Sequence, residues 1–162
     1  MVTFYFDTSA IVKRYHKELG SEVLDKIFEA KEHGFALSFW TILEFTVVFS
    51  ARMRRKTLSR HAFNTVISRF LKDVLDMFAV TSVTDELIAS ATPLAIKHNL
   101  PSADCLQLAS ALNLKKALEA AEEKLVLICS DKDLCKAAEK EGTEFINPEE
   151  KYASEKLNRF LT

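Results

Sequence analysis

The sequence predicts an α/β fold, a three-layer α/β/α sandwich around a central, mostly parallel sheet of five strands. Short apolar runs alternate along the chain with longer amphipathic stretches, which is the pattern of a parallel sheet covered by helices. Only 3 Gly and 3 Pro are present, too few for the many turns of an all-β fold. The 162 residues fit one domain, which we place at residues 1–150, and residues 151–162 are a tail that can form a short helix.

Five short apolar runs are predicted to be the strands. Residues 2–6 (VTFYF) and 125–129 (LVLIC) are continuous apolar runs, typical of strands buried on both faces. The other three runs lie at residues 35–38, 77–80 and 144–146.

Seven amphipathic stretches are predicted to be helices. Ser59 and Thr84 are suitable N-caps, and Pro101 stands where a helix can begin without losing a hydrogen bond. The expected helices cover approximately residues 8–15, 21–34, 40–55, 59–74, 84–95, 101–112 and 130–142.

Charge and cysteine content narrow the class of protein. The chain has 22 Lys and Arg against 23 Asp and Glu, and the net charge of -1 excludes a generic polycationic binder of nucleic acid. No apolar run approaches the roughly 20 residues that span a bilayer, so we expect no membrane association. The 3 Cys lack a CxxC spacing and are typical of reduced thiols, so we expect a cytoplasmic protein.

Four carboxylates occupy unusual places in this predicted fold. Asp7 follows the first strand and Asp131 follows the fourth, and ligands of open parallel sheets bind at the carboxyl ends of strands. Glu44 and Asp104 lie on strongly apolar helices, where an isolated carboxylate is costly to bury unless it is paired or metal-bound. Each residue also has a structural explanation. Asp7 and Asp131 can cap helices, Asp104 can interact with a helix dipole, and Glu44 can face solvent.

Taken together, the four carboxylates predict a metal site. Converging carboxylates repel one another and raise one another's pKa values, and a hard divalent cation relieves that repulsion. Mg²⁺ and Mn²⁺ prefer oxygen ligands, and the sequence offers no His or Cys cluster as an alternative ligand set. Asp133 is a further acid close to Asp131.

Several segments carry these acids in a characteristic order. They are residues 4–10 (FYFDTSA), the helix with Glu44, residues 100–111 (LPSADCLQLASA) and residues 127–134 (LICSDKDL), followed by Gly142, Asn147 and Pro148. In this order and spacing they resemble the PIN-domain family, of the kind found in VapC-type toxins. The resemblance covers about residues 1–150.

The resemblance implies a metal-dependent endoribonuclease that acts on single-stranded or structured RNA. Carried over by motif, the catalytic residues and ligands of Mg²⁺ or Mn²⁺ are Asp7, Glu44, Asp104 and Asp131. Ser9 and Ser130 match polar positions beside the site, and Asp133 fits a less constant acidic position. The resemblance also implies a cognate antitoxin as partner, and the helices over residues 40–76 fit a hairpin that the family often uses in dimers and antitoxin contacts.

Two basic runs are candidate contacts for RNA phosphates. They lie near the ends of the helices that follow Asp7 and carry Glu44. The alternative is an ordinary solvated helix end, where cations are favoured. The candidate residues are Lys13, Arg14, Arg52, Arg54, Arg55 and Lys56.

The aromatic content predicts a homodimer. Phe makes up 12 of the 162 residues, a large apolar load for a small domain. Phe39, Phe45 and Phe49 can lie either in a dimer interface or in the core.

Two alternatives keep the fold and change the function. One is a non-catalytic module that binds RNA or protein, and the other is a stand-alone RNA-processing nuclease without an antitoxin. A phosphotransfer enzyme with Asp7 as acceptor fits poorly, because the haloacid-dehalogenase-type motif has a second Asp where this chain has Ser9.

Overall fold

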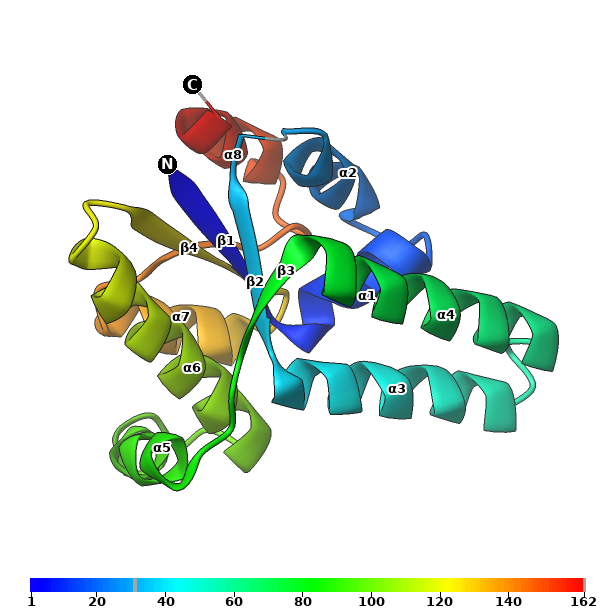
Figure 1. The fold of residues 1–162 in the computed structure, drawn as a ribbon, viewed down its shortest axis with the longest axis horizontal. Coiled ribbons are helices and arrows are strands. Elements are labelled where there is room, and N and C mark those ends of the chain that lie inside the picture. Colours follow the sequence, from blue (N-terminus) through cyan, green and yellow to red (C-terminus); the bar gives the residue numbers. More distant parts are fainter. Residues whose placement is uncertain (31, 162) are drawn as a thin grey trace.

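Strands and helices alternate along residues 1–30 and 32–161, the part of the chain that the computed structural model describes (Figure 1). The strands are β1 (Val2–Phe6), β2 (Gly34–Ser38), β3 (Phe78–Thr81), β4 (Lys124–Ile128) and β5 (Glu144–Ile146). The helices are α1 (Thr8–Tyr15), α2 (Ser21–Glu29), α3 (Phe39–Arg54), α4 (Arg60–Met77), α5 (Asp85–His98), α6 (Ser102–Glu119), α7 (Lys132–Lys140) and α8 (Ala153–Leu161). None of these helices combines the length and the apolar character needed to cross a membrane.

The five strands form one parallel sheet with the order β3-β2-β1-β4-β5. Strand β1 lies at the centre, and its register against β4 pairs Phe6 with Ile128. The backbone N–H of Asp7 donates to the carbonyl of Ile128 over 3.0 Å, which extends this pairing beyond the end of β1. The carboxyl ends of the two central strands therefore meet at one edge, where the sequence places Asp7 and Asp131.

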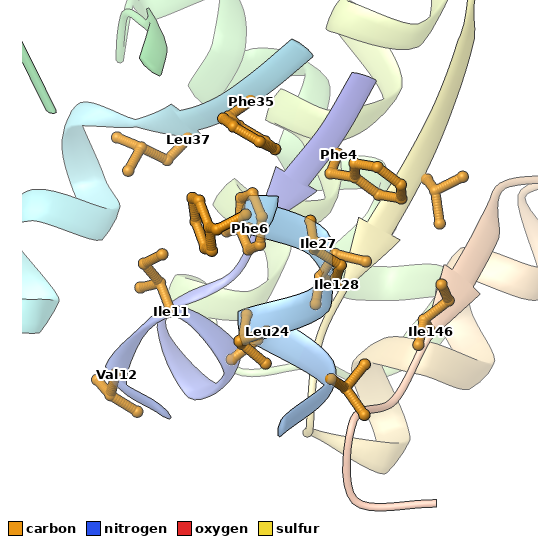
Figure 2. Close-up of a cluster of buried hydrophobic side chains, with 14 of the residues drawn as sticks. Phe4, Phe6, Ile11, Val12, Leu24, Ile27, Phe35, Leu37, Ile128 and Ile146 are labelled. Atoms are coloured by element: carbon orange, nitrogen blue, oxygen red, sulfur yellow. The ribbon is translucent and has the colours of Figure 1, made fainter. Parts of the chain in front are cut away.

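Two hydrophobic clusters cover the two faces of the sheet. Because side chains alternate along a strand, Phe4 and Phe6 of β1 pack into one cluster and Tyr5 packs into the other. Figure 2 shows the first cluster, in which Leu24 of α2 lies against the sheet. Leu108 of α6 belongs to the second, together with residues of α5 and α7. The sheet is covered by helices on both faces, so the predicted three-layer α/β/α sandwich is confirmed.

Helices α3 and α4 form a hairpin that projects from the sheet in Figure 1. Phe45 and Phe49 of α3 are fully buried, and Phe45 stacks on Phe70 of α4 with ring centroids 3.8 Å apart. These rings belong to the core, so the interpretation of Phe45 and Phe49 as interface residues is wrong. Phe39, by contrast, is 56% exposed at the start of α3.

The predicted and observed elements differ mainly at their ends. Helix α3 begins at Phe39 because Ser38 and Thr41 form a capping box. Helix α6 continues past the predicted end through Lys, Ala and Leu, which are good helix formers. The tail forms α8, and its residues Ala153 and Leu157 are buried in the first cluster. The domain boundary at residue 150 stays a prediction.

Candidate active site

The two acids at the strand ends are helix N-caps, as their structural explanation proposed. Oδ2 of Asp7 accepts hydrogen bonds from the backbone N–H of Ser9 at 2.9 Å and from the Ser9 hydroxyl at 2.5 Å. Oδ1 of Asp131 accepts from the backbone N–H groups of Asp133 at 2.8 Å and Leu134 at 2.9 Å. These bonds use one oxygen of each carboxylate, so capping is compatible with a second role for the other oxygen.

Glu44 and Asp104 reach the same edge from two different helices. Asp104 lies in the first turn of α6. Glu44 lies on α3 and is partly buried, and its Oε2 accepts from the Thr8 hydroxyl at 2.7 Å and from Nε2 of Gln107 at 3.0 Å. Thr8 is adjacent to Asp7, and Gln107 is one helical turn beyond Asp104. The two bonds therefore hold the Glu44 carboxylate beside the other acids instead of leaving it to face solvent.

Mutual repulsion is the clearest sign that these carboxylates form one group. The pKa of Asp104 is raised to about 7, first by burial and then by the negative charges of four neighbouring carboxylates. Burial also raises the pKa of Asp7, against the opposing effect of the hydrogen bonds from Ser9. We call the five residues the acidic cluster. In order of their effect on Asp104, its four neighbours in the cluster are Asp7, Asp131, Glu44 and Asp133.

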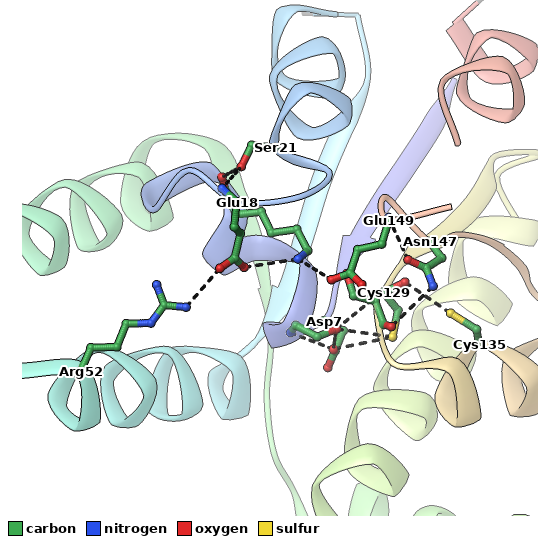
Figure 3. Close-up of polar contacts among 11 residues, drawn as sticks. Asp7, Glu18, Ser21, Arg52, Cys129, Cys135, Asn147 and Glu149 are labelled. Atoms are coloured by element: carbon green, nitrogen blue, oxygen red, sulfur yellow. Dashed lines mark hydrogen bonds and ion pairs between the residues drawn. The ribbon is translucent and has the colours of Figure 1, made fainter. Parts of the chain in front are cut away.

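Ser9 and Ser130 connect the ends of β1 and β4 beside the acidic cluster. The Ser9 hydroxyl donates to Asp7 and accepts from the backbone N–H of Ser130 at 2.9 Å. The carbonyl of Ser130 accepts from Nδ2 of Asn147 at 3.5 Å, and Asn147 is labelled in Figure 3. Among the described residues, the buried Ser130 hydroxyl has no hydrogen-bond partner. A buried hydroxyl without a partner is costly, so this oxygen is a candidate contact for a ligand.

Three residues of this region were not predicted to act at the site. Gln107 is a polar residue on an apolar helix, which is the same signal that identified Glu44 and Asp104. Asn147 was predicted only as part of the motif that ends with Pro148. Cys129 is a fully buried core residue, but its Sγ also lies 3.7 Å from Oδ2 of Asp7.

The basic candidates fall into two groups. Nζ of Lys13 is buried and pairs with Oε1 of Glu149 at 2.7 Å and Oε1 of Glu18 at 3.2 Å. Nη2 of Arg52 pairs with Oε2 of the same Glu18 at 3.3 Å (Figure 3), and Nε of Arg14 lies 3.6 Å from a carboxylate oxygen of Asp73. These three cations connect separate elements through ion pairs, and this structural role was not predicted. The exposed basic candidates are Arg54, Arg55 and Lys56, at the end of α3 and just beyond it.

The acidic cluster has the donor chemistry that a hard divalent cation requires. Its carboxylate oxygens are the ligands that Mg²⁺ and Mn²⁺ prefer, and the Ser130 hydroxyl is a further oxygen without a partner among the described residues. In the described part of the chain, no three His, Cys, Asp or Glu side chains are already arranged to hold a metal.

The fold and the acidic cluster together define a class of α/β protein whose acidic residues meet at the carboxyl edge of a parallel sheet. Within that class, the family model of the PIN domain matches residues 4–140 of this chain. The chain belongs to the PIN domain family, as predicted, and proteins of this family are generally nucleases. A comparison with curated proteins found no match.

Solved structures share this fold along most of the chain. PAE2754 from Pyrobaculum aerophilum matches with a TM-score of 0.62 and 22% identity, over 99% of this chain and 89% of that chain. The structure of VapBC2 from Rickettsia felis bound to a DNA fragment from its promoter matches with a TM-score of 0.60 and 13% identity, over 90% of this chain and 97% of that chain. FitAcB from Neisseria gonorrhoeae matches with a TM-score of 0.62 and 18% identity, over 90% of this chain and 97% of that chain. At these identities the matches show a common fold.

Proposed function

We propose that this protein is an endoribonuclease that cleaves phosphodiester bonds of RNA with the help of Mg²⁺ or Mn²⁺. The main support is the acidic cluster, in which burial and four neighbouring charges raise the pKa of Asp104 to about 7. Such a concentration of negative charge is unfavourable until a cation neutralises it. Membership of a family of nucleases supports the same conclusion.

In the proposed site, Asp7, Asp104 and Asp131 hold the cation and Glu44 completes the ligand set. When bound, the cation makes a water molecule more acidic and stabilises charge that develops on the phosphate. The chain contributes by fixing its carboxylates in place through the caps of α1 and α7 and the donors to Glu44. We assign the Ser9 hydroxyl a structural role, because it fixes the Asp7 carboxylate and also accepts from the backbone N–H of Ser130. Attack by water therefore fits this site better than covalent catalysis.

For contacts to RNA phosphates we retain Arg54, Arg55 and Lys56. Their side chains are exposed on the hairpin that carries Glu44. Phosphate contacts by such cations weaken as salt concentration rises, with a slope of roughly 0.7 per contact for single strands. Lys13 is buried in ion pairs, so we assign it a structural role. Arg14 and Arg52 are secondary candidates, because each is already paired with a carboxylate.

We further propose that the protein is the toxin of a toxin–antitoxin pair and acts in the cytoplasm as a homodimer. Structures named VapBC2 and FitAcB share its fold, which supports a cognate antitoxin as partner. For the homodimer, we point to a stripe on α3 formed by Phe39, Leu43 and Val47, each 54–56% exposed. Their spacing of four residues places them on one side of the helix, and such exposed apolar stripes mark contact surfaces.

Cleavage of single-stranded RNA by Asp104→Asn tests the catalytic assignment. We expect wild-type protein to cleave with Mn²⁺ or Mg²⁺ and to stop when EDTA removes the ion, and we expect Asp104→Asn to lose cleavage. Asp25→Asn, at an exposed acid of α2, is the matched control and should cleave normally. Full activity of Asp104→Asn would show that the assignment is wrong.

Two further observations separate the proposal from its alternatives. Calorimetry that finds no binding of Mn²⁺ or Mg²⁺ would favour a non-catalytic module that binds RNA or protein. A small antitoxin-like reading frame directly upstream would support the toxin assignment, and its absence would favour a stand-alone RNA-processing nuclease.

A further inference from the structure

A buried glutamine connects the centre of the sheet with the acidic cluster. Gln107 of α6 is 0% exposed. Its Nε2 donates to Oε2 of Glu44 at 3.0 Å and to Oγ1 of Thr41 at 3.0 Å. Its Oε1 accepts from the Tyr5 hydroxyl at 3.0 Å. One side-chain amide thus joins β1, α3 and α6 at the place where Glu44 reaches the other acids.

The chemistry of its neighbours determines which way this amide points. An ionised carboxylate only accepts hydrogen bonds, so the amide group that faces Glu44 must be the NH₂. The carbonyl oxygen then faces the Tyr5 hydroxyl, which can donate to it. The reversed amide would place its oxygen against the carboxylate of Glu44, and two acceptors repel. The network therefore holds Gln107 in the single orientation that serves Glu44.

Glu44 is held from two sides through one oxygen. The Thr8 hydroxyl and Nε2 of Gln107 both donate to Oε2, at 2.7 Å and 3.0 Å. The two bonds orient the carboxylate without using Oε1. A glutamate side chain that is free to rotate loses conformational entropy when it is fixed. Here the protein fixes the side chain before any ligand arrives.

We infer that Gln107 is a positioning residue, and that with Thr8 it forms a clamp that presents Glu44 to the divalent cation of the proposed nuclease site. The inference rests on the proposed function, because it assigns Glu44 to that site. Residues that orient metal ligands commonly change metal affinity by about 10–100-fold when they are replaced. The alternative is that Gln107 only satisfies the buried hydroxyls of Tyr5 and Thr41, in which case its loss lowers stability without changing metal affinity.

Titration calorimetry with Mn²⁺ distinguishes these roles without measuring cleavage. Gln107→Met preserves the length of the side chain and removes its donor, and we expect Mn²⁺ to bind about 10-fold more weakly. Thr8→Val removes the other donor to Glu44 from a different helix and should weaken binding in the same direction. The control is Leu108→Val, which loses core packing on α6 at the adjacent, fully buried position and should bind Mn²⁺ like wild type.

A double-mutant cycle tests whether Gln107 acts through Glu44. Glu44→Ala should weaken Mn²⁺ binding, and adding Gln107→Met to Glu44→Ala should change the affinity by less than about twofold. If Gln107→Met does not fold, Thr8→Val combined with Glu44→Ala tests the clamp by the same cycle.

The cycle also separates the failure of this inference from the failure of the proposed function. If Glu44→Ala weakens Mn²⁺ binding but the two clamp variants bind like Leu108→Val, the clamp is refuted and the proposed site stands. If Glu44→Ala binds Mn²⁺ like wild type, or wild type binds none, both the clamp and the place of Glu44 in the proposed site are refuted.

Discussion

Asp104→Asn should stabilise the metal-free protein, even though it is expected to abolish activity. Burial and four neighbouring carboxylates raise the pKa of Asp104 from 3.8 to about 7. Near pH 8 the side chain is therefore charged in the folded protein, where the charge is unfavourable, and charged in the unfolded chain, where water solvates it. Asparagine has nearly the same shape and no charge, so the substitution removes this penalty.

The size of the effect follows from proton linkage. One pKa unit corresponds to about 1.36 kcal/mol, so a rise from 3.8 to about 7 sets an upper limit of roughly 4 kcal/mol. Asp104 is only partly buried, and solvent screening reduces the figure to about 1–2 kcal/mol. Between these two pKa values the folded state holds a proton that the unfolded chain has released. The free energy of unfolding of the metal-free protein therefore falls as pH rises through this window.

Urea unfolding in EDTA, followed by circular dichroism at pH 5 and pH 8, measures this effect. The gain from Asp104→Asn should be larger at pH 8 than at pH 5. Asp25→Asn, on the exposed side of α2, should change stability by less than about 0.5 kcal/mol. Saturating Mn²⁺ should stabilise wild type and not Asp104→Asn, because a ligand stabilises only the folded state that binds it. Equal or lower stability of Asp104→Asn at pH 8 would refute the argument from repulsion.

Three further predictions concern the core, the ion pairs and the surface. Phe45→Ala should lower the free energy of unfolding by about 3–5 kcal/mol in urea, because the buried ring stacks on Phe70, and a loss below about 1 kcal/mol would contradict its core position. Lys13→Met should cost about 1–2 kcal/mol, since Glu149 loses its ion-pair partner and Glu18 keeps only Arg52, while RNA affinity at low salt should remain that of wild type. Leu43→Glu should convert the proposed homodimer to monomers in sedimentation equilibrium. Leu75→Glu, at an 86% exposed position of α4, should leave the dimer intact, and a dimeric Leu43→Glu protein would exclude the α3 stripe as the interface.

Local pattern was sufficient to predict the class of fold, because strand and helix periodicity are properties of neighbouring residues. Strand β1 and the capped helix after it follow directly from an apolar run that ends at Asp7. The strand order was not predictable in this way, because it depends on pairs such as Phe6 with Ile128 that are far apart in the chain. The end of α6 was also misplaced, since good helix formers carry the helix beyond its apolar stripe.

The same distinction applies to the site. The positions of Asp7 and Asp131 at the carboxyl edge of the sheet could be predicted, because a strand end and a helix start mark both residues. The burial of Lys13 could not be foreseen, because its partner Glu149 lies at the other end of the chain. Gln107 was overlooked although it carried the signal of a polar residue on an apolar helix, because an uncharged amide can be satisfied in a core in many ways.

The placement of the acids explains how a repulsive cluster of carboxylates can exist without a neutralising cation. Asp7 and Asp131 cap helices, a role that typically contributes about 1 kcal/mol each, and Asp104 lies in a first turn, where the helix dipole favours a negative charge. These three carboxylates are therefore stabilised by backbone N–H groups or helix dipoles. Glu44 lies in the middle of α3 and has no such support. The position of Glu44 depends on side-chain donors from other elements. Thr8 and Gln107 therefore stabilise the Glu44 carboxylate, as helix N-termini stabilise the carboxylates of Asp7, Asp104 and Asp131.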